Sequence, residues 1–136
     1  MSVERDRRLA VLLTAYAAAS LLHFVHNAEF LAEYPNLPAS WTRTGVYLAW
    51  VGLSAVGLAG WLMVSRGYQR VGLALLCAYA LLGIDSLGHY AVAPFSAHTS
   101  AMNATILMEV GMAMVVFAEV MRRIVRRNFR ASATGA

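Results

Sequence analysis

Long apolar runs alternate with short polar breaks along this chain. The runs cover residues 9–31, 45–64, 71–90 and 102–121. A helix needs about 20 residues to cross about 30 Å of hydrocarbon, so each run is long enough to span a bilayer. The pattern predicts an all-α, polytopic membrane protein built as a four-transmembrane-helix bundle.

Composition agrees with this fold class. Of the 136 residues, 60% are hydrophobic and 13% are charged, which is far from the balance of a soluble domain. Because the polar breaks are short, we expect residues 1–136 to form a single four-helix domain. The second run contains several glycines but no acidic, basic or histidine residue, which indicates close packing against a neighbouring helix and no chemistry of its own.

Positive charge lies almost entirely on one side of the predicted membrane. The chain has no lysine, and of its 11 arginines only Arg43 falls in an outer connection. The positive-inside rule therefore places both termini in the cytoplasm and residues 34–44 outside. The net charge of +4 is then explained by topology and by attraction to the lipid bilayer, and it requires no nucleic-acid partner.

The N-terminus also has some features of a cleavable signal peptide. Arg7 and Arg8 precede an apolar stretch and the small residues of positions 17–20, as in processed leaders. However, the apolar run continues through Leu22 and Phe24. This continuation favours an uncleaved first helix.

Ionisable side chains interrupt three of the four apolar runs. Apart from Glu119, near the end of the fourth run, there are six: His23, His26 and Glu29 in the first run, Asp85 and His89 in the third, and Glu109 in the fourth. With a helical rise of about 1.5 Å per residue, His23 and Asp85 lie roughly 21 Å from the cytoplasmic ends of their helices, and Glu109 lies roughly 18 Å from its own. The other three residues lie further out or share a helix face with these. Because ionisable groups in hydrocarbon are costly and usually functional, we expect one common site in the outer half of the membrane.

Imidazole nitrogens and carboxylate oxygens together suit a divalent transition metal. Zn, Fe and Cu all accept such ligands, and helix bundles commonly build metal sites from inward-facing side chains. The leading hypothesis is therefore a metal site formed by the six residues just named, with an oxidoreductase or hydrolase activity on a small lipophilic substrate.

Three other hypotheses remain open from the sequence. In a metal-free enzyme, Asp85 and Glu109 would be the catalytic acid and base on a lipid or isoprenoid. In a carrier of haem b, His26 and His89 would be the axial ligands. In a transporter or accessory subunit, the polar cluster would be structural. The sequence does not decide among these, and it leaves an oligomer possible.

A short motif resembles a known family. His26, Asn27, Ala28 and Glu29, followed by Phe30 near the outer end of the first run, resemble the signature of the HXXEE-domain family of small bacterial membrane proteins. The segment 85–89, which ends in His89, resembles a polar segment that such proteins carry in a later helix. The resemblance implies a multi-pass protein of the bacterial inner membrane with a polar site, and it names no reaction.

Overall fold

The computed structural model describes the backbone of residues 3–134 and the side chains of residues 7–129. Within this part the chain is all-helical. The main helices are α1 (Val3–Glu29), α2 (Arg43–Ser65), α3 (Gln69–Ile84), α4 (His89–Val92) and α5 (Ser100–Thr134). Short 3-10 helices lie between them: η1 (Leu31–Glu33), η2 (Asp85–Gly88) and η3 (Phe95–Ala97). Arg5 and Arg130, which enter the charge pattern above, lie outside the described side chains.

Four helical segments are long and apolar enough to cross a membrane, as the sequence predicts. They are Arg7–Glu29, Arg43–Ser65, Gln69–Val92 and Ser100–Phe129. Each contains or closely overlaps one of the predicted runs. The third segment combines α3, η2 and α4.

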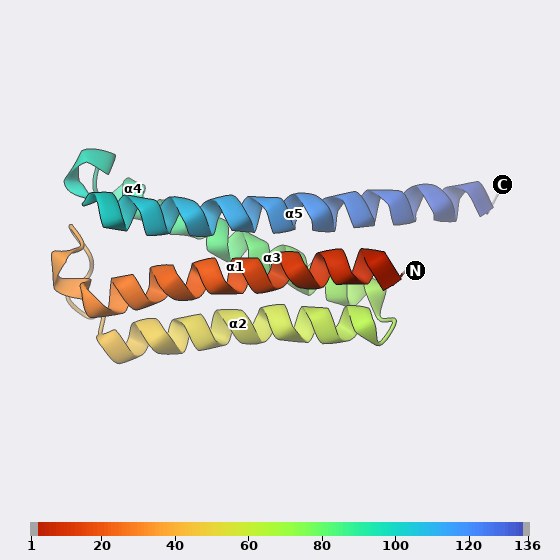
Figure 1. The fold of residues 1–136 in the computed structure, drawn as a ribbon, viewed down its shortest axis with the longest axis horizontal. Helices are drawn as coiled ribbons and strands as arrows, with labels where there is room; N and C mark the ends of the chain where they lie inside the picture. The colour runs from red at the N-terminus through yellow and green to blue at the C-terminus, as the bar shows by residue number, and fades with distance from the viewer. Residues whose placement is uncertain (1–2, 135–136) are drawn as a thin grey trace.

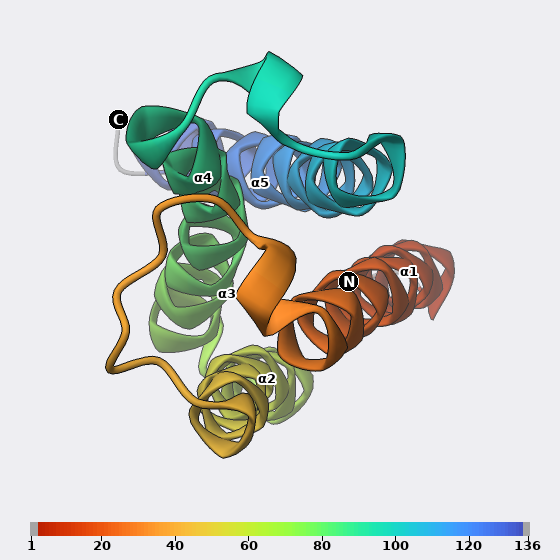
Figure 2. The same ribbon diagram turned by 90° about the vertical axis from the view of Figure 1, so that its left-hand side faces the viewer.

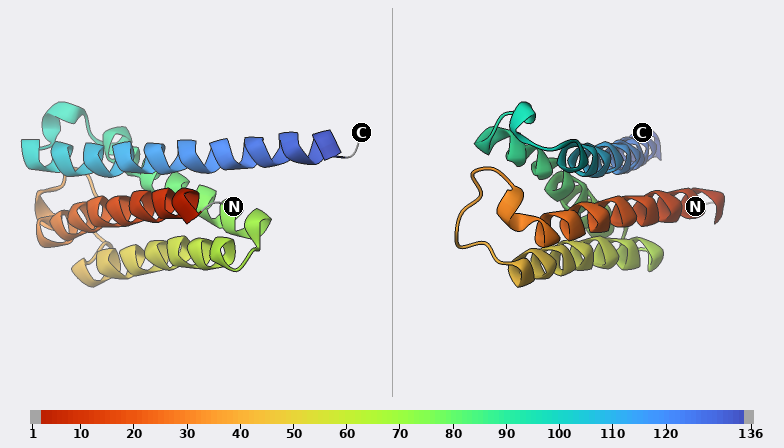
Figure 3. Two further views of the ribbon diagram at one scale, coloured as in Figure 1. Left: turned by 45° about the vertical axis from the view of Figure 1, so that its right-hand side comes forward. Right: turned by 60° about the vertical axis from the view of Figure 1, so that its left-hand side comes forward.

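The long helices run alternately up and down in one bundle. α2 packs against α1 and α3, and α5 packs against the same two helices on the other side (Figure 2). Both chain ends lie at one end of the bundle, and α5 extends beyond it there (Figure 1). The α1–α2 and α4–α5 connections lie together at the opposite end, which we call the connection end (Figure 3).

Glycines let α2 and α3 approach each other closely in the half of the bundle nearer the chain termini. A Cβ atom on Gly72 would lie 2.6 Å from the Val64 backbone nitrogen and 2.8 Å from the Gly60 carbonyl oxygen. A Cβ on Gly57 would meet the Tyr79 ring at 2.7 Å. Only glycine permits such contact between helix backbones. The packing role predicted for the second apolar run therefore has a structural basis.

The core in this half of the bundle is almost entirely apolar. Leu76, Val116 and Val120 are completely buried. Tyr16 is also buried, and its hydroxyl donates a hydrogen bond to the Tyr79 carbonyl oxygen at 3.1 Å. Apart from Glu119 and Arg123, which are buried and pair with each other near the end where α1 begins, the polar groups of the interior gather in the other half, towards the connection end.

The third predicted run is not one uninterrupted α-helix. Residues Asp85–Gly88 form the 3-10 helix η2, and α4 resumes at His89. A 3-10 helix turns about 120° per residue, compared with about 100° in an α-helix. The side chains after Asp85 are therefore rotated from the positions that a regular helix gives them, and this rotation shapes the site.

Candidate functional site

A histidine and a glutamate form a pair in the bundle core. His23 on α1 is 2% exposed and Glu109 on α5 is completely buried. Their closest polar atoms, His23 Nε2 and Glu109 Oε2, are 3.7 Å apart. The Ser86 hydroxyl in η2 donates a hydrogen bond of 2.7 Å to the same carboxylate oxygen. Three of the four membrane-length segments thus meet at one carboxyl group.

The contacts around His23 indicate where its proton lies. The Thr105 hydroxyl donates to the Met102 carbonyl oxygen at 3.0 Å, so it can only accept from His23 Nδ1, which is 3.4 Å away. This direction favours the His23 tautomer that carries its proton on Nδ1, with Nε2 facing Glu109. Because an unpaired charge is costly in the interior, we expect His23 and Glu109 to share one further proton and to be neutral as a pair.

His89 extends this pair towards the connection end. Its ring lies edge-on to the His23 ring, with 5.3 Å between the ring centroids. The Asn27 side-chain amide donates to His89 Nε2 at 3.4 Å, which leaves the His89 proton on Nδ1. The Asn27 Oδ1 atom is buried and has no hydrogen-bond partner among the described residues.

Two aromatic residues of the connections close this cluster. Tyr34, which follows η1, is buried, and its ring lies 5.1 Å from the His89 ring. Its hydroxyl shares a hydrogen bond of 2.9 Å with His26 Nδ1. His98, which follows η3, is also buried, and its ring lies 6.2 Å from the His89 ring. Burial raises the pKa of Tyr34 to about 12, so its hydroxyl keeps its proton at neutral pH.

Hydrogen bonds hold the two connections over the site. Asn36, with a left-handed φ of 58°, donates through its side chain to the Val92 carbonyl oxygen at 2.9 Å. Asn103 on α5 donates to the carbonyl oxygens of Phe95 and His98, and it accepts from the Tyr90 hydroxyl at 2.9 Å. These contacts tie the connections to the helices beneath them.

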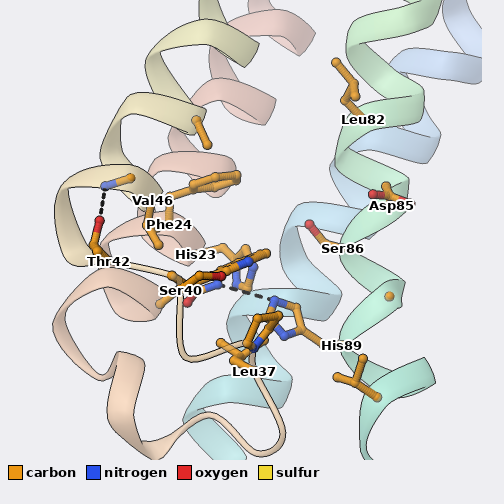
Figure 4. A pocket seen from close by; sticks show the side chains of 17 residues that line it. His23, Phe24, Leu37, Ser40, Thr42, Val46, Leu82, Asp85, Ser86 and His89 are labelled. Atoms are coloured by element: carbon orange, nitrogen blue, oxygen red, sulfur yellow. Dashed lines mark hydrogen bonds between the residues drawn. The ribbon is translucent and has the colours of Figure 1, made fainter.

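A cavity of about 590 Å³ lies next to the histidine cluster, between α1, α2 and the α3–α4 segment (Figure 4). This volume is in the range of small-molecule sites. Its apolar wall includes Phe24, Trp41, Val46, Ala49, Leu82 and Val92. Its polar wall includes His23, Asn27, Asp85, Ser86 and His89. Ser86 and His89 point from the α3–α4 side towards α1 (Figure 4).

Some predicted site residues do not reach the histidine–glutamate pair. Glu29 is exposed and turned towards α2, where its Oε1 atom accepts from Arg43 Nη2 at 2.7 Å and from the Tyr47 hydroxyl at 2.6 Å. Asp85 is exposed and lines the cavity, while Ser86 takes the position beside Glu109. A single turn of 3-10 helix explains why Ser86, and not Asp85, lies beside Glu109. This turn rotates Asp85 and His89 away from a common helix face.

The arrangement also bears on the proposed cofactors. Among the described residues, no group of three or more histidine, cysteine, aspartate or glutamate side chains is close enough to hold one metal ion. His26 and His89 both contact the Tyr34 ring, with centroid distances of 5.8 and 5.1 Å. The space between these two imidazoles is thus filled by Tyr34, and a haem does not fit there without displacing it.

The site includes residues that we did not predict from the sequence. Ser86, Thr105 and Asn27 are ordinary polar residues inside apolar runs, and only their partners give them a role. Tyr34 and His98 lie in the connections, where aromatic and histidine residues usually face the membrane interface. The two prolines near Tyr34 predict a fixed turn, but they do not show which way its ring points.

A comparison with models of known protein families, with curated proteins and with solved structures found no match for this chain. The resemblance to the HXXEE-domain family therefore stays a prediction. The function must be argued from the site itself.

Proposed function

We propose that this chain is an integral membrane protein that binds a small lipid-soluble molecule in the cavity and transfers protons to and from it. One observation carries this proposal: a mainly apolar cavity has, on one wall, two histidines backed by a buried carboxyl group. Apolar pockets with a few convergent polar groups are typical of small-molecule sites.

The outer surface of the bundle supports insertion in a membrane. Large apolar side chains face outwards on all the long helices, for example Val11 on α1, Leu48 on α2, Val71 on α3 and Met114 on α5, each more than half exposed. Such a surface is unfavourable in water and favourable in hydrocarbon. Arg66, between α2 and α3, and Arg70, in the first turn of α3, share the end of the bundle at which both termini lie. By the positive-inside rule, this end lies on the cytoplasmic side of a bacterial inner membrane, and the cavity lies in the outer half of that membrane.

We propose that a ligand enters the cavity from the bilayer, between α2 and α3. These helices pack backbone to backbone in the cytoplasmic half, through Gly60 and Gly72. Towards the connection end, both Ala49 on α2 and Leu82 on α3 line the cavity and are exposed. Because its apolar wall continues onto the lipid-facing surface, a lipid-soluble molecule can enter without crossing water.

The chemistry that these residues support is general acid–base catalysis. His89 and His23 line the cavity and would touch the bound molecule. Glu109 is not among the lining residues; it lies behind His23, with 3.7 Å between Oε2 and Nε2, and we expect the pair to share a proton. The neutral pair can donate its shared proton to the bound molecule, which leaves one negative charge on Glu109, and it becomes neutral again when it takes a proton back. Glu109 therefore acts as a positioning and proton-holding residue, and the histidines act as the catalytic residues.

Retention of a bound molecule tests the binding part of this proposal. The protein is purified from its membrane in mild detergent, and the lipids that stay with it are identified and counted by mass spectrometry. We expect one species to be enriched near one molecule per chain. Ala49→Phe, which fills the cavity, should lose it, whereas Leu48→Phe on the neighbouring lipid-facing position should keep it. Equal retention by the two variants would contradict binding in this cavity.

Hydrogen exchange tests the proton-transfer part. The purified protein with its retained molecule is incubated in D₂O, and the mass of the extracted molecule is measured after its hydroxyl and amine positions are exchanged back. We expect deuterium on carbon with the wild type, and much slower incorporation with His89→Gln and Glu109→Gln. Glu33→Gln, at an exposed position of η1, is the control. If all four proteins give the same result, the site binds without acid–base chemistry.

A further inference from the structure

The charges and hydrogen-bonding groups of the cavity wall narrow the class of molecule that it takes. We infer that the ligand is an amphiphile whose head is a hydrogen-bond donor without negative charge, such as a hydroxyl or a protonated amine. This inference rests on the proposed function, and it excludes fatty acids and phosphorylated lipids.

Negative charge is the only fixed charge on the wall. Asp85 is its single acidic residue, and neither lysine nor arginine lines the cavity. Arg43, adjacent in sequence to the lining residue Thr42, is turned away: it holds Glu29 through Nε at 2.9 Å and Nη2 at 2.7 Å. A carboxylate or phosphate in the cavity would meet no permanent cation, and an ionised Asp85 would repel it.

One buried hydrogen-bonding group of the wall is an unfilled acceptor. Asn27 is 4% exposed and lines the cavity, and its Oδ1 atom has no partner among the described residues. A buried acceptor without a donor is costly, so a ligand that donates a hydrogen bond here is favoured. The Ser86 hydroxyl proton is already used on Glu109, which leaves its oxygen as a further acceptor. An alcohol or an ammonium head supplies such donors, while a carboxylate supplies none.

The two ends of the cavity fix the orientation of such a ligand. Ala49 and Leu82 lie further from the connection end than Thr42 and Asp85 on the same helical segments. The head group would therefore lie beside Asn27 and His89, with the hydrocarbon tail between Ala49 and Leu82 and into the bilayer. The site then selects by head-group charge and tolerates tails of different length.

Tryptophan quenching measures this selection directly. Trp41 lines the cavity, and the other two tryptophans of the chain are Trp50 and Trp61. A Trp50→Phe/Trp61→Phe variant reports on the cavity alone. Three probes of equal chain length are compared in micelles: 9,10-dibromooctadecanol, 9,10-dibromooctadecylamine and 9,10-dibromostearic acid. A Trp41→Phe/Trp50→Phe variant, which keeps only Trp61, corrects for non-specific partition of each probe.

We expect saturable quenching of Trp41 by the alcohol and the amine, displaced by unbrominated octadecanol, and binding of the acid weaker by about tenfold or more. Asp85→Asn should remove the advantage of the amine over the alcohol and should improve binding of the acid. Glu29→Gln, which changes a carboxylate outside the cavity, should alter none of these values.

The outcomes separate this inference from the function on which it rests. If no probe quenches Trp41 beyond the Trp61 reference, binding of lipid-soluble molecules in the cavity is wrong. If the acid binds as well as the alcohol, the cavity binds lipids but its proposed charge selection is wrong. Unchanged binding of the amine and the acid in Asp85→Asn would also overturn the role of Asp85.

Discussion

Removal of the Glu109 carboxyl group should destabilise the bundle far more than removal of any exposed carboxylate. In Glu109→Ala, the Ser86 hydroxyl and His23 Nε2 both lose their partner in the interior. Each unsatisfied buried group costs about 1–3 kcal/mol, and breaking a buried pair costs about 3–5 kcal/mol in total. We therefore expect Glu109→Ala to lower the free energy of unfolding by about 3–5 kcal/mol. Glu109→Gln keeps an acceptor for Ser86 and a donor for His23, so it should lose less than about 1.5 kcal/mol.

The free energies are measured by SDS titration of the protein in mixed micelles, followed by circular dichroism. Glu29→Ala is the matched control, because its exposed pair with Arg43 should contribute little. A double-mutant cycle with His23→Ala isolates the pair: the double variant should cost less than the sum of the single variants by about 1 kcal/mol or more. Additivity within about 0.5 kcal/mol, or a Glu109→Ala loss no larger than that of Glu29→Ala, would refute the pair as the centre of the site.

Three further outcomes follow. Gly72→Ala should lower the unfolding free energy by about 1–3 kcal/mol in the same titration, because its Cβ meets backbone atoms. Gly52→Ala, whose Cβ has nothing within 4 Å, should raise the unfolding free energy slightly. The reverse order of the two variants would contradict the helix packing. A reporter fused after Ala136 should be active only in the cytoplasm, and periplasmic activity would invert the proposed orientation. EDTA should leave the melting temperature unchanged, because no three ligand side chains converge among residues 7–129; a decrease of several degrees, reversed by Zn²⁺, would restore the metal hypothesis.

The number and approximate positions of the long helices could be predicted from the sequence because hydrophobic length determines them, whereas α5 continues to Thr134, well beyond the predicted run. The level of the polar residues could also be estimated, since a helix rises uniformly. This estimate gives similar depths to His23, Asp85 and Glu109, which lie on three different runs. Two of these residues, His23 and Glu109, meet at 3.7 Å in the structure. The depth of a residue along its helix can thus be predicted from the sequence, whereas the helix that supplies its partner cannot.

Rotation about the helix axis was predicted less well, because it depends on local geometry. A regular helix would put Asp85 and His89 on one face, but the 3-10 segment Asp85–Gly88 separates them and places Ser86 beside Glu109. Nothing in the apolar pattern marks this change of helix type. Glu29 differs for another reason: Arg43 and Tyr47, on the next helix, capture its carboxylate, and such a long-range pair is not encoded in the spacing of either run.

For the connections, the sequence predicts a fixed turn around Tyr34 that covers the site and allows His98 to fold back over it, but it does not give the contacts of these side chains. Tyr34 and His98 come from segments without periodicity, where sequence gives no direction for a side chain. In the structure both rings turn inwards and cover His89, at 5.1 and 6.2 Å between centroids. The Asn36 and Asn103 hydrogen bonds that hold them are tertiary contacts. These residues complete the site, and only the folded chain shows them.

The most direct test of this account is a density map of the protein in nanodiscs made from its own membrane, without added ligand. The account predicts an elongated density that begins within hydrogen-bonding distance of Asn27 and His89 and runs between Ala49 and Leu82 towards the bilayer. A cavity filled only by water, or closed by contact between α2 and α3 along their whole length, would contradict it.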